Sequence, residues 1–207
     1  MARPIDYYFS LLSPWAYIGH GPFMEVVRRH GVMVTFKPIL LASVFAETGG
    51  LPFGKRHPAR LRYRIIELQR WREKRGLTFN LHPRFWPLNA ETADRFVIAL
   101  VAAGHDPDPF LRHAFAAVWE QEQNLADEAT LIAIADSLTL PGADLLADAR
   151  GDEIKAKYAQ NIEDAIAGEV IGSPSYVLDG ELFWGQDRLD LLDDALRSGR
   201  QAYRSDA

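Results

Sequence analysis

Hydrophobic positions at the start of the chain are arranged as two strands joined by one helix. Residues 4–10 (PIDYYFS) and 33–39 (MVTFKPI) are short runs rich in aromatic and β-branched residues, which predicts strands. Between them, Ser13 and Pro14 predict a helix start, with serine as the N-cap and proline at the first helical position, and Gly31 predicts its end. Because a single helix connects the two strands, we expect them to be parallel neighbours.

The middle of the chain has the period of helices. A Gly/Pro-rich loop is predicted at 49–58, and after it Leu61, Ile65, Leu68 and Trp71 recur at helical spacing. A second loop is predicted at 82–96, where Asn89 or Thr92 would cap the following helix. Helices are predicted at 59–76, 93–103, 109–121, 128–138 and 151–167.

The end of the chain returns to strands. SYVLDG (175–180) and ELFWG (181–185) predict two short strands joined at Asp179-Gly180, a pair that favours a tight hairpin. The segment 187–199 predicts a closing helix with Asp187 as its N-cap.

The resulting order is β-α-β, a run of helices, and then β-β-α. A sheet built from both ends of the chain explains this order economically, and it is the order of a thioredoxin-like fold of the α/β class. We therefore predict a thioredoxin-like domain formed by residues 1–45 plus 168–207, interrupted by an all-helical insertion at 46–167.

The composition narrows the chemistry. The chain has 207 residues, 48% of them hydrophobic, and a net charge of −5 without a long Lys/Arg run, which argues against nucleic acid and membrane surfaces as partners. It contains no cysteine, which excludes disulfides, thiolate metal sites and a cysteine nucleophile of its own. Its six histidines lack metal-ligand spacing, so we expect no metal site. With no signal-peptide pattern and only short apolar stretches, we expect a cytoplasmic protein.

Ser13 has two interpretations, and they are compatible. It is a helix N-cap, and its position at the positive end of a helix dipole also suits a bound anion. Its hydroxyl proton would then point outward to a thiolate brought in by a ligand. A charge-assisted hydrogen bond contributes about 1.5–3 kcal/mol, enough to ionise a thiol whose pKa is ordinarily about 8.5.

Two later motifs carry similar alternatives. Ser173-Pro174 is either an edge-strand proline or a cis-proline whose preceding backbone groups pair with a peptide-like ligand. Residues 184–188 (WGQDR) are either a strand end and a cap, or a site where helix N–H groups bind a carboxylate and Asp187 binds an ammonium.

YYFSLLSPWAYIG, YRIIELQRW and GSPSYVLDGELFWGQDRL together resemble the 2-hydroxychromene-2-carboxylate isomerase family. That family is related to kappa-class glutathione transferases and, more distantly, to DsbA-type oxidoreductases. The resemblance covers nearly the whole chain. It implies a homodimer with glutathione as cofactor that interconverts 2-hydroxychromene-2-carboxylate and trans-o-hydroxybenzylidenepyruvate in naphthalene-type catabolism.

The resemblance also implies roles for single residues. Ser13 corresponds to the catalytic serine, and Ser173 beside Pro174 to the backbone contact of glutathione. The γ-glutamyl contacts fall on Trp184, Gly185, Gln186 and Asp187, and the substrate contacts fall near Val44, Phe45, Lys55 and Phe85. Trp15 and Trp86 could also line an apolar pocket, and Lys55 or Arg62 could hold a substrate carboxylate.

Two other functions stay open at this point. One is a kappa-type transferase or peroxidase that acts on other electrophiles with glutathione. The other is a non-catalytic binding module on a thioredoxin-like scaffold. Because there is no cysteine, a DsbA-like oxidoreductase is excluded.

Overall fold

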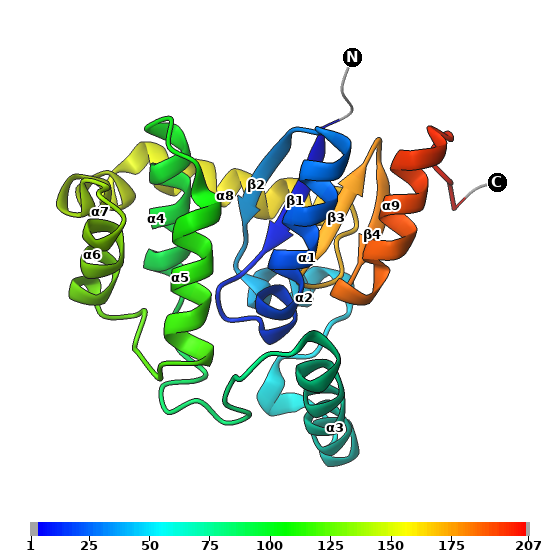
Figure 1. Cartoon of the computed structure of the whole chain (residues 1–207), viewed down its shortest axis with the longest axis horizontal. Helices are drawn as coiled ribbons and strands as arrows, with labels where there is room; N and C mark the ends of the chain where they lie inside the picture. Colours follow the sequence, from blue (N-terminus) through cyan, green and yellow to red (C-terminus); the bar gives the residue numbers. More distant parts are fainter. Residues whose placement is uncertain (1–3, 206–207) are drawn as a thin grey trace.

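Four strands from the two ends of the chain form one mixed sheet (Figure 1). The computed structural model describes residues 4–205. Strands β1 (Ile5–Phe9) and β2 (Val34–Pro38) are parallel, whereas β3 (Ser175–Leu178) pairs antiparallel with β1 and with β4 (Glu181–Trp184). The order across the sheet is β2-β1-β3-β4. The predicted parallel pair and the predicted hairpin are therefore both confirmed.

Helix α1 (Pro14–His30) begins and ends where the sequence predicts. Ser13 Oγ accepts a hydrogen bond from Ala16 N at 3.2 Å, and Gly31 closes the helix with a φ of 60°, a left-handed conformation that glycine adopts without steric cost. Figure 1 shows α1 and α9 (Leu189–Ser198) in front of the sheet, with α8 (Asp152–Ala167) passing behind it. The sheet is thus covered on both faces, as a buried central strand requires.

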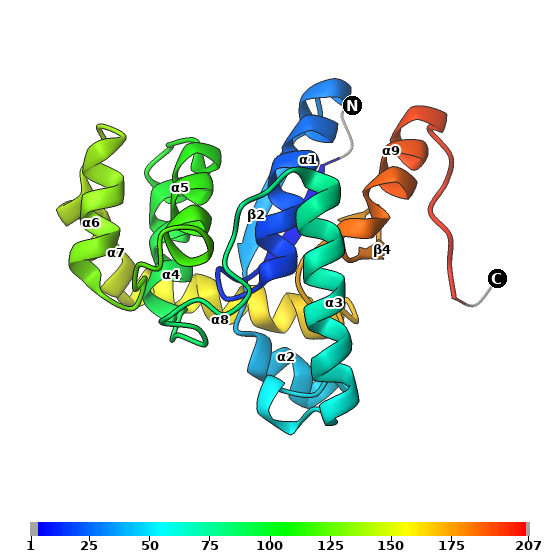
Figure 2. The same cartoon turned by 60° about the horizontal axis from the view of Figure 1, so that its bottom comes forward.

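The helical insertion has two parts. Helices α4 to α7 form a group beside the sheet, and α3 stands apart from them next to α1 (Figures 1 and 2). Neither Asn89 nor Thr92 is the N-cap of α4: Ala90 holds that position without a side-chain bond, and Asn89 Oδ1, one residue earlier, accepts from Glu91 N at 3.0 Å. The bounds of the helices in this part are α3 (Pro58–Arg75), α4 (Glu91–Ala102), α5 (Pro107–Trp119), α6 (Glu128–Ser137) and α7 (Gly142–Arg150).

One hydrophobic core runs through the sheet and the insertion. Tyr7 and Phe9 of β1 are fully buried in the same cluster as Phe96 of α4 and Phe115 of α5. The rings of Phe9 and Phe115 lie 6.5 Å apart. The insertion is therefore held to the sheet by the core itself, and the proposed boundary between residues 45 and 46 falls inside helix α2 (Leu41–Thr48).

Three local features differ from the expectations. Helices α2 and α7 lie where no helix was predicted: each has fewer than ten residues, and neither begins with a side-chain cap. A short 3-10 helix, η1 (Phe53–Lys55), lies within the predicted loop at 49–58. Asp187 is not the cap of the last helix, because a 3-10 turn, η2 (Gln186–Arg188), precedes α9 and moves the helix start to Leu189.

Candidate active site

Ser13 lies at the turn between β1 and α1, buried beneath the segment that precedes β3. Only 4% of its surface is exposed. Its hydroxyl accepts from Ala16 N and donates to the Ser173 carbonyl oxygen at 3.0 Å, so the hydroxyl proton predicted to point toward a ligand is instead held by the protein. That carbonyl, predicted to be open to a ligand, retains a second lone pair for another donor.

The Ser173-Pro174 peptide bond is cis, and a backbone hydrogen bond connects this segment to the motif at 184–188. Gly185 N donates to the Pro174 carbonyl at 2.9 Å, which holds the residues after β4 against this segment. Gly172 has no side chain where a Cβ would collide with the Trp184 indole, so that ring lies directly over the backbone. The two motifs therefore form one continuous wall.

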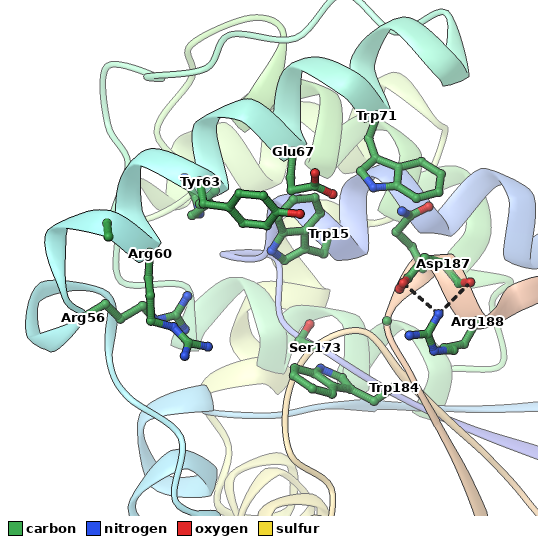
Figure 3. A pocket seen from close by; sticks show the side chains of 14 residues that line it. Trp15, Arg56, Arg60, Tyr63, Glu67, Trp71, Ser173, Trp184, Asp187 and Arg188 are labelled. Carbon is green, nitrogen blue, oxygen red and sulfur yellow. Dashed lines mark hydrogen bonds and ion pairs between the residues drawn. The ribbon is translucent and has the colours of Figure 1, made fainter.

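A cavity of about 600 Å³ lies between this wall and helix α3 (Figure 3). Trp15 of α1 closes it at the back, and Tyr63, Glu67 and Trp71 project into it from α3, facing Trp184. The volume is within the ordinary range of about 300–1,000 Å³ for small-molecule sites. Aromatic rings from three elements supply its apolar surface, with charged groups at both ends.

One end of the cavity is cationic. Arg56, Arg60 and Arg64 line it, and Arg56 and Arg60 lie side by side in Figure 3. Arg64 is only 8% exposed, and its guanidinium stacks over the rings of Trp86 at 4.6 Å and Phe53 at 5.2 Å. Its Nη2 has no hydrogen-bond partner among the described residues. Burial and the neighbouring Arg56 lower the pKa of Arg64 to about 10, so it remains charged at neutral pH.

The other end carries both signs of charge. Asp187 and Arg188 form an ion pair at 2.9 Å, and both side chains are about half exposed to the cavity mouth. Gln186 is buried, and its Oε1 accepts from Arg75 Nη2 at 3.3 Å. Glu67 lies nearby on α3, where the hydrogen bond from Arg70 lowers the pKa of its carboxyl. This end offers partners to a carboxylate and to an ammonium at once.

The structure brings together the residues predicted to bind the cofactor but not those predicted to bind the substrate. Ser173, Trp184, Gly185, Gln186 and Asp187 all line the cavity. Ser13 lies one hydrogen bond behind it, through Ser173. None of Val44, Phe45, Lys55 and Phe85 lines it: Val44 is fully buried in a small core cluster with Tyr8 and Ile39, and the Phe45 ring packs under the Arg56 guanidinium.

The face of α3 that lines the cavity was missed from the sequence. Its polar and aromatic residues Arg60, Tyr63, Arg64, Glu67 and Trp71 recur every three or four positions, as one face of a helix does. The apolar stripe on the same helix gives a stronger signal and concealed this second period. Lys55 and Arg62, the two cations that were predicted, do not line the cavity.

Comparison with known proteins identifies the family. Residues 4–197 match the model of the DSBA-like thioredoxin domain, which covers nearly the whole chain. The chain belongs to the DsbA-like thioredoxin family. Within residues 4–205, this DsbA-like protein shows no group of three metal-ligating side chains and no helix long and apolar enough to cross a membrane.

Its relatives include enzymes of two kinds. The chain is 26% identical to a 2-hydroxychromene-2-carboxylate isomerase of Sphingobium xenophagum over 95% of its own length and 99% of the relative's. It is 23% identical to the glutathione S-transferase kappa 1 of Caenorhabditis elegans, covering 93% and 90% of the two chains. A solved structure of a 2-hydroxychromene-2-carboxylate isomerase superposes with a TM-score of 0.79 at 22% identity, covering 94% and 95%. The DsbA-like fold is thus shared with isomerases that match this chain from end to end.

Proposed function

We propose that the protein is a glutathione-dependent isomerase that interconverts 2-hydroxychromene-2-carboxylate and trans-o-hydroxybenzylidenepyruvate, in aromatic catabolism of the naphthalene type. The observation that supports this most is the assembly of the residues at 173 and 184–187 into one wall of a cavity, directly above Ser13. Relatives with this name over the full length of the chain support the same reaction. A homodimer and a cytoplasmic location stay predictions.

The charges of the cavity fit glutathione, a tripeptide with a carboxylate at each end and an ammonium at one of them. Asp187 and Arg188 would hold the ammonium and the carboxylate of the γ-glutamyl end. Arg56 and Arg60 would hold the carboxylate of the glycine end, and the Trp184 ring would cover the peptide between them. A cationic end and an end with both signs of charge therefore define both the length and the direction of the bound peptide.

Ser13 and Ser173 would exchange partners when the site is filled. In the structure the Ser13 hydroxyl donates to the Ser173 carbonyl. A peptide N–H from the ligand can donate to the second lone pair of the same carbonyl, and the Ser13 hydroxyl can then turn from that carbonyl to donate to a neighbouring sulfur. One hydrogen bond replaces another, so the exchange costs little free energy.

The chemistry requires an ionised thiol and a held substrate. Glutathione, when bound, would supply a thiolate nucleophile for reversible addition to the conjugated double bond of the keto acid, a chemistry without net oxidation or reduction. The Ser13 hydroxyl stabilises the negative sulfur by about 1.5–3 kcal/mol, which lowers the pKa of a thiol by about one to two. Arg64, buried between aromatic rings with an unpaired N–H, would hold the substrate carboxylate.

A kappa-type transferase is the alternative, supported by the relative of that name. The two reactions differ in their products: a conjugate retains glutathione, whereas an isomer does not. Mass spectrometry of the reaction mixture therefore separates them.

The experiment that tests the proposal follows the absorbance change of the chromene carboxylate with glutathione and the protein. We expect Ser13→Ala to lose about one to two orders of magnitude in kcat, the loss of one charge-assisted hydrogen bond. Ser137→Ala is a matched control, because it deletes a hydroxyl that also donates to a backbone carbonyl, at 2.7 Å, but on α6. No turnover by the wild type, or full turnover by Ser13→Ala, would contradict the proposal.

A further inference from the structure

A buried carboxylate of the insertion lies directly behind the turn that carries Ser13. Asp94, on α4, is 1% exposed. Its Oδ1 accepts from Leu11 N at 3.1 Å, and its Oδ2 accepts from the Ser10 hydroxyl at 3.3 Å and from the Tyr158 hydroxyl of α8 at 3.2 Å. Two of its three donors therefore belong to the residues just before Ser13.

The same turn is joined to the wall of the cavity. Ser10 N donates to Ser173 Oγ at 3.1 Å, and Ser13 N donates to the Ser10 carbonyl at 2.9 Å. With the Ser13 hydroxyl on the Ser173 carbonyl, these bonds form a closed set of contacts from Asp94 to both serines. A change at the Asp94 carboxylate reaches Ser13 through Ser10, whose hydroxyl donates to Asp94 and whose carbonyl accepts from Ser13 N.

We infer that Asp94, in its ionised form, is a positioning residue that holds the Ser10–Ser13 turn and so sets the place of Ser13 against Ser173. Resting on the proposed function, this role gives the helical insertion control over the position of Ser13 in the glutathione site. Asp94 does not line the cavity, so its effect on the site passes through the turn.

Burial of the carboxylate makes its ionisation sensitive to pH near neutrality. Burial raises the pKa of Asp94 to about 7, against the lowering effect of its three donors, Leu11, Tyr158 and Ser10. Glu91 on the same helix raises the pKa further, and Arg95, also on α4, acts on Tyr158, whose pKa it lowers. The ionised carboxylate accepts all three hydrogen bonds. Protonation makes one oxygen a hydrogen-bond donor and a weaker acceptor, so the hydrogen bonds at that oxygen weaken or reverse direction.

The first test needs neither ligand nor activity. In the ¹⁵N-labelled protein, the amide signals of Leu11 and Ser13 should titrate together with an apparent pKa near 7. In Asp94→Asn both transitions should vanish. Tyr158→Phe is the matched control: it removes one donor to the carboxylate but leaves both contacts with the turn, so both transitions should move to higher pH. A Leu11 signal that titrates while Ser13 does not would overturn the inference.

The second test measures kinetics with glutathione and the chromene carboxylate above pH 8. Asp94→Asn should lower kcat about tenfold with the KM for glutathione little changed, because positioning and not binding is lost. Tyr158→Phe should reach the wild-type kcat at pH values above its own raised amide transition, where Asp94 is again ionised. Wild-type kinetics in Asp94→Asn would refute the inference. Coupled amide titrations in a protein that shows no glutathione turnover would support the coupling and refute the proposed function.

Discussion

Asparagine in place of Asp94 should remove a pH-dependent cost from the stability of the fold. An aspartate in the unfolded chain ionises with a pKa near 3.8, whereas burial raises the pKa of Asp94 in the folded protein to about 7. Each tenfold change in the acid constant corresponds to about 1.4 kcal/mol. Ionising Asp94 in the folded state therefore costs about 4 kcal/mol at pH values above 7.

The sign of the effect follows from proton binding. Below about pH 4 both states hold the proton, and the carboxyl makes no pH-dependent contribution. Between about pH 4 and pH 7 the folded state holds a proton that the unfolded state has lost, so the free energy of unfolding falls as the pH rises. Above pH 7 both states are ionised and the full cost is present. Relative to Asp94→Asn, the wild type should lose about 4 kcal/mol across this range.

Urea unfolding of both proteins at steps from about pH 4 to pH 8.5 measures this difference directly. Other ionisable groups are the same in the two proteins, so their contributions cancel in the difference curve. Asp152→Asn is the control, because the side chain of Asp152 is fully exposed, and its difference curve should be nearly flat. A flat or rising curve for Asp94→Asn would refute the reasoning from burial.

Three further substitutions test the cavity. Arg64→Met should raise the KM for the keto acid about tenfold, because the cation that holds its carboxylate is lost. The melting temperature should not fall, since the substitution removes a buried cation with an unpaired N–H. An unchanged KM would argue against a substrate carboxylate at Arg64. Gly185→Ala should lower the free energy of unfolding in urea by about 1–3 kcal/mol and weaken glutathione binding in calorimetry. The reason is that φ is 103° at this position and a Cβ would collide with Asp187. Wild-type affinity for glutathione would count against the γ-glutamyl site. Gly19→Ala should weaken glutathione binding as well, because a Cβ would lie 2.6 Å from the Gln186 Cβ. Unchanged affinity would show that α1 accommodates the methyl group without displacing Gln186.

The burial of Asp94 behind the Ser13 turn lowers the stability of the fold. A buried carboxylate that ionises near neutral pH destabilises the fold wherever it is charged. Its hydrogen bonds go to the turn before Ser13, so the cost falls on the element that carries the proposed chemistry. This is consistent with a group retained for position, and the tests above separate that role from simple packing.

The sequence by itself determined the features that depend on neighbouring residues. Ser13 and Pro14 specify a helix start through bonds within one turn, and Asp179-Gly180 specifies a hairpin because both residues adopt positive φ values there. The order of elements then predicts the thioredoxin-like sheet. The absence of cysteine directs any thiol chemistry to a ligand.

Only the tertiary structure decided which distant side chains meet. The arginines of α3 became a cavity wall because the helix lies across the cavity from Ser173. Asp94 became a buried partner of the turn because α4 packs against β2 and reaches the residues that follow β1. The extra turn η2 redirected Asp187 from capping a helix to pairing with Arg188 at the cavity mouth. Caps and turns are read from adjacent residues, whereas burial, desolvation and the pairing of charges arise from contacts between elements far apart in the chain.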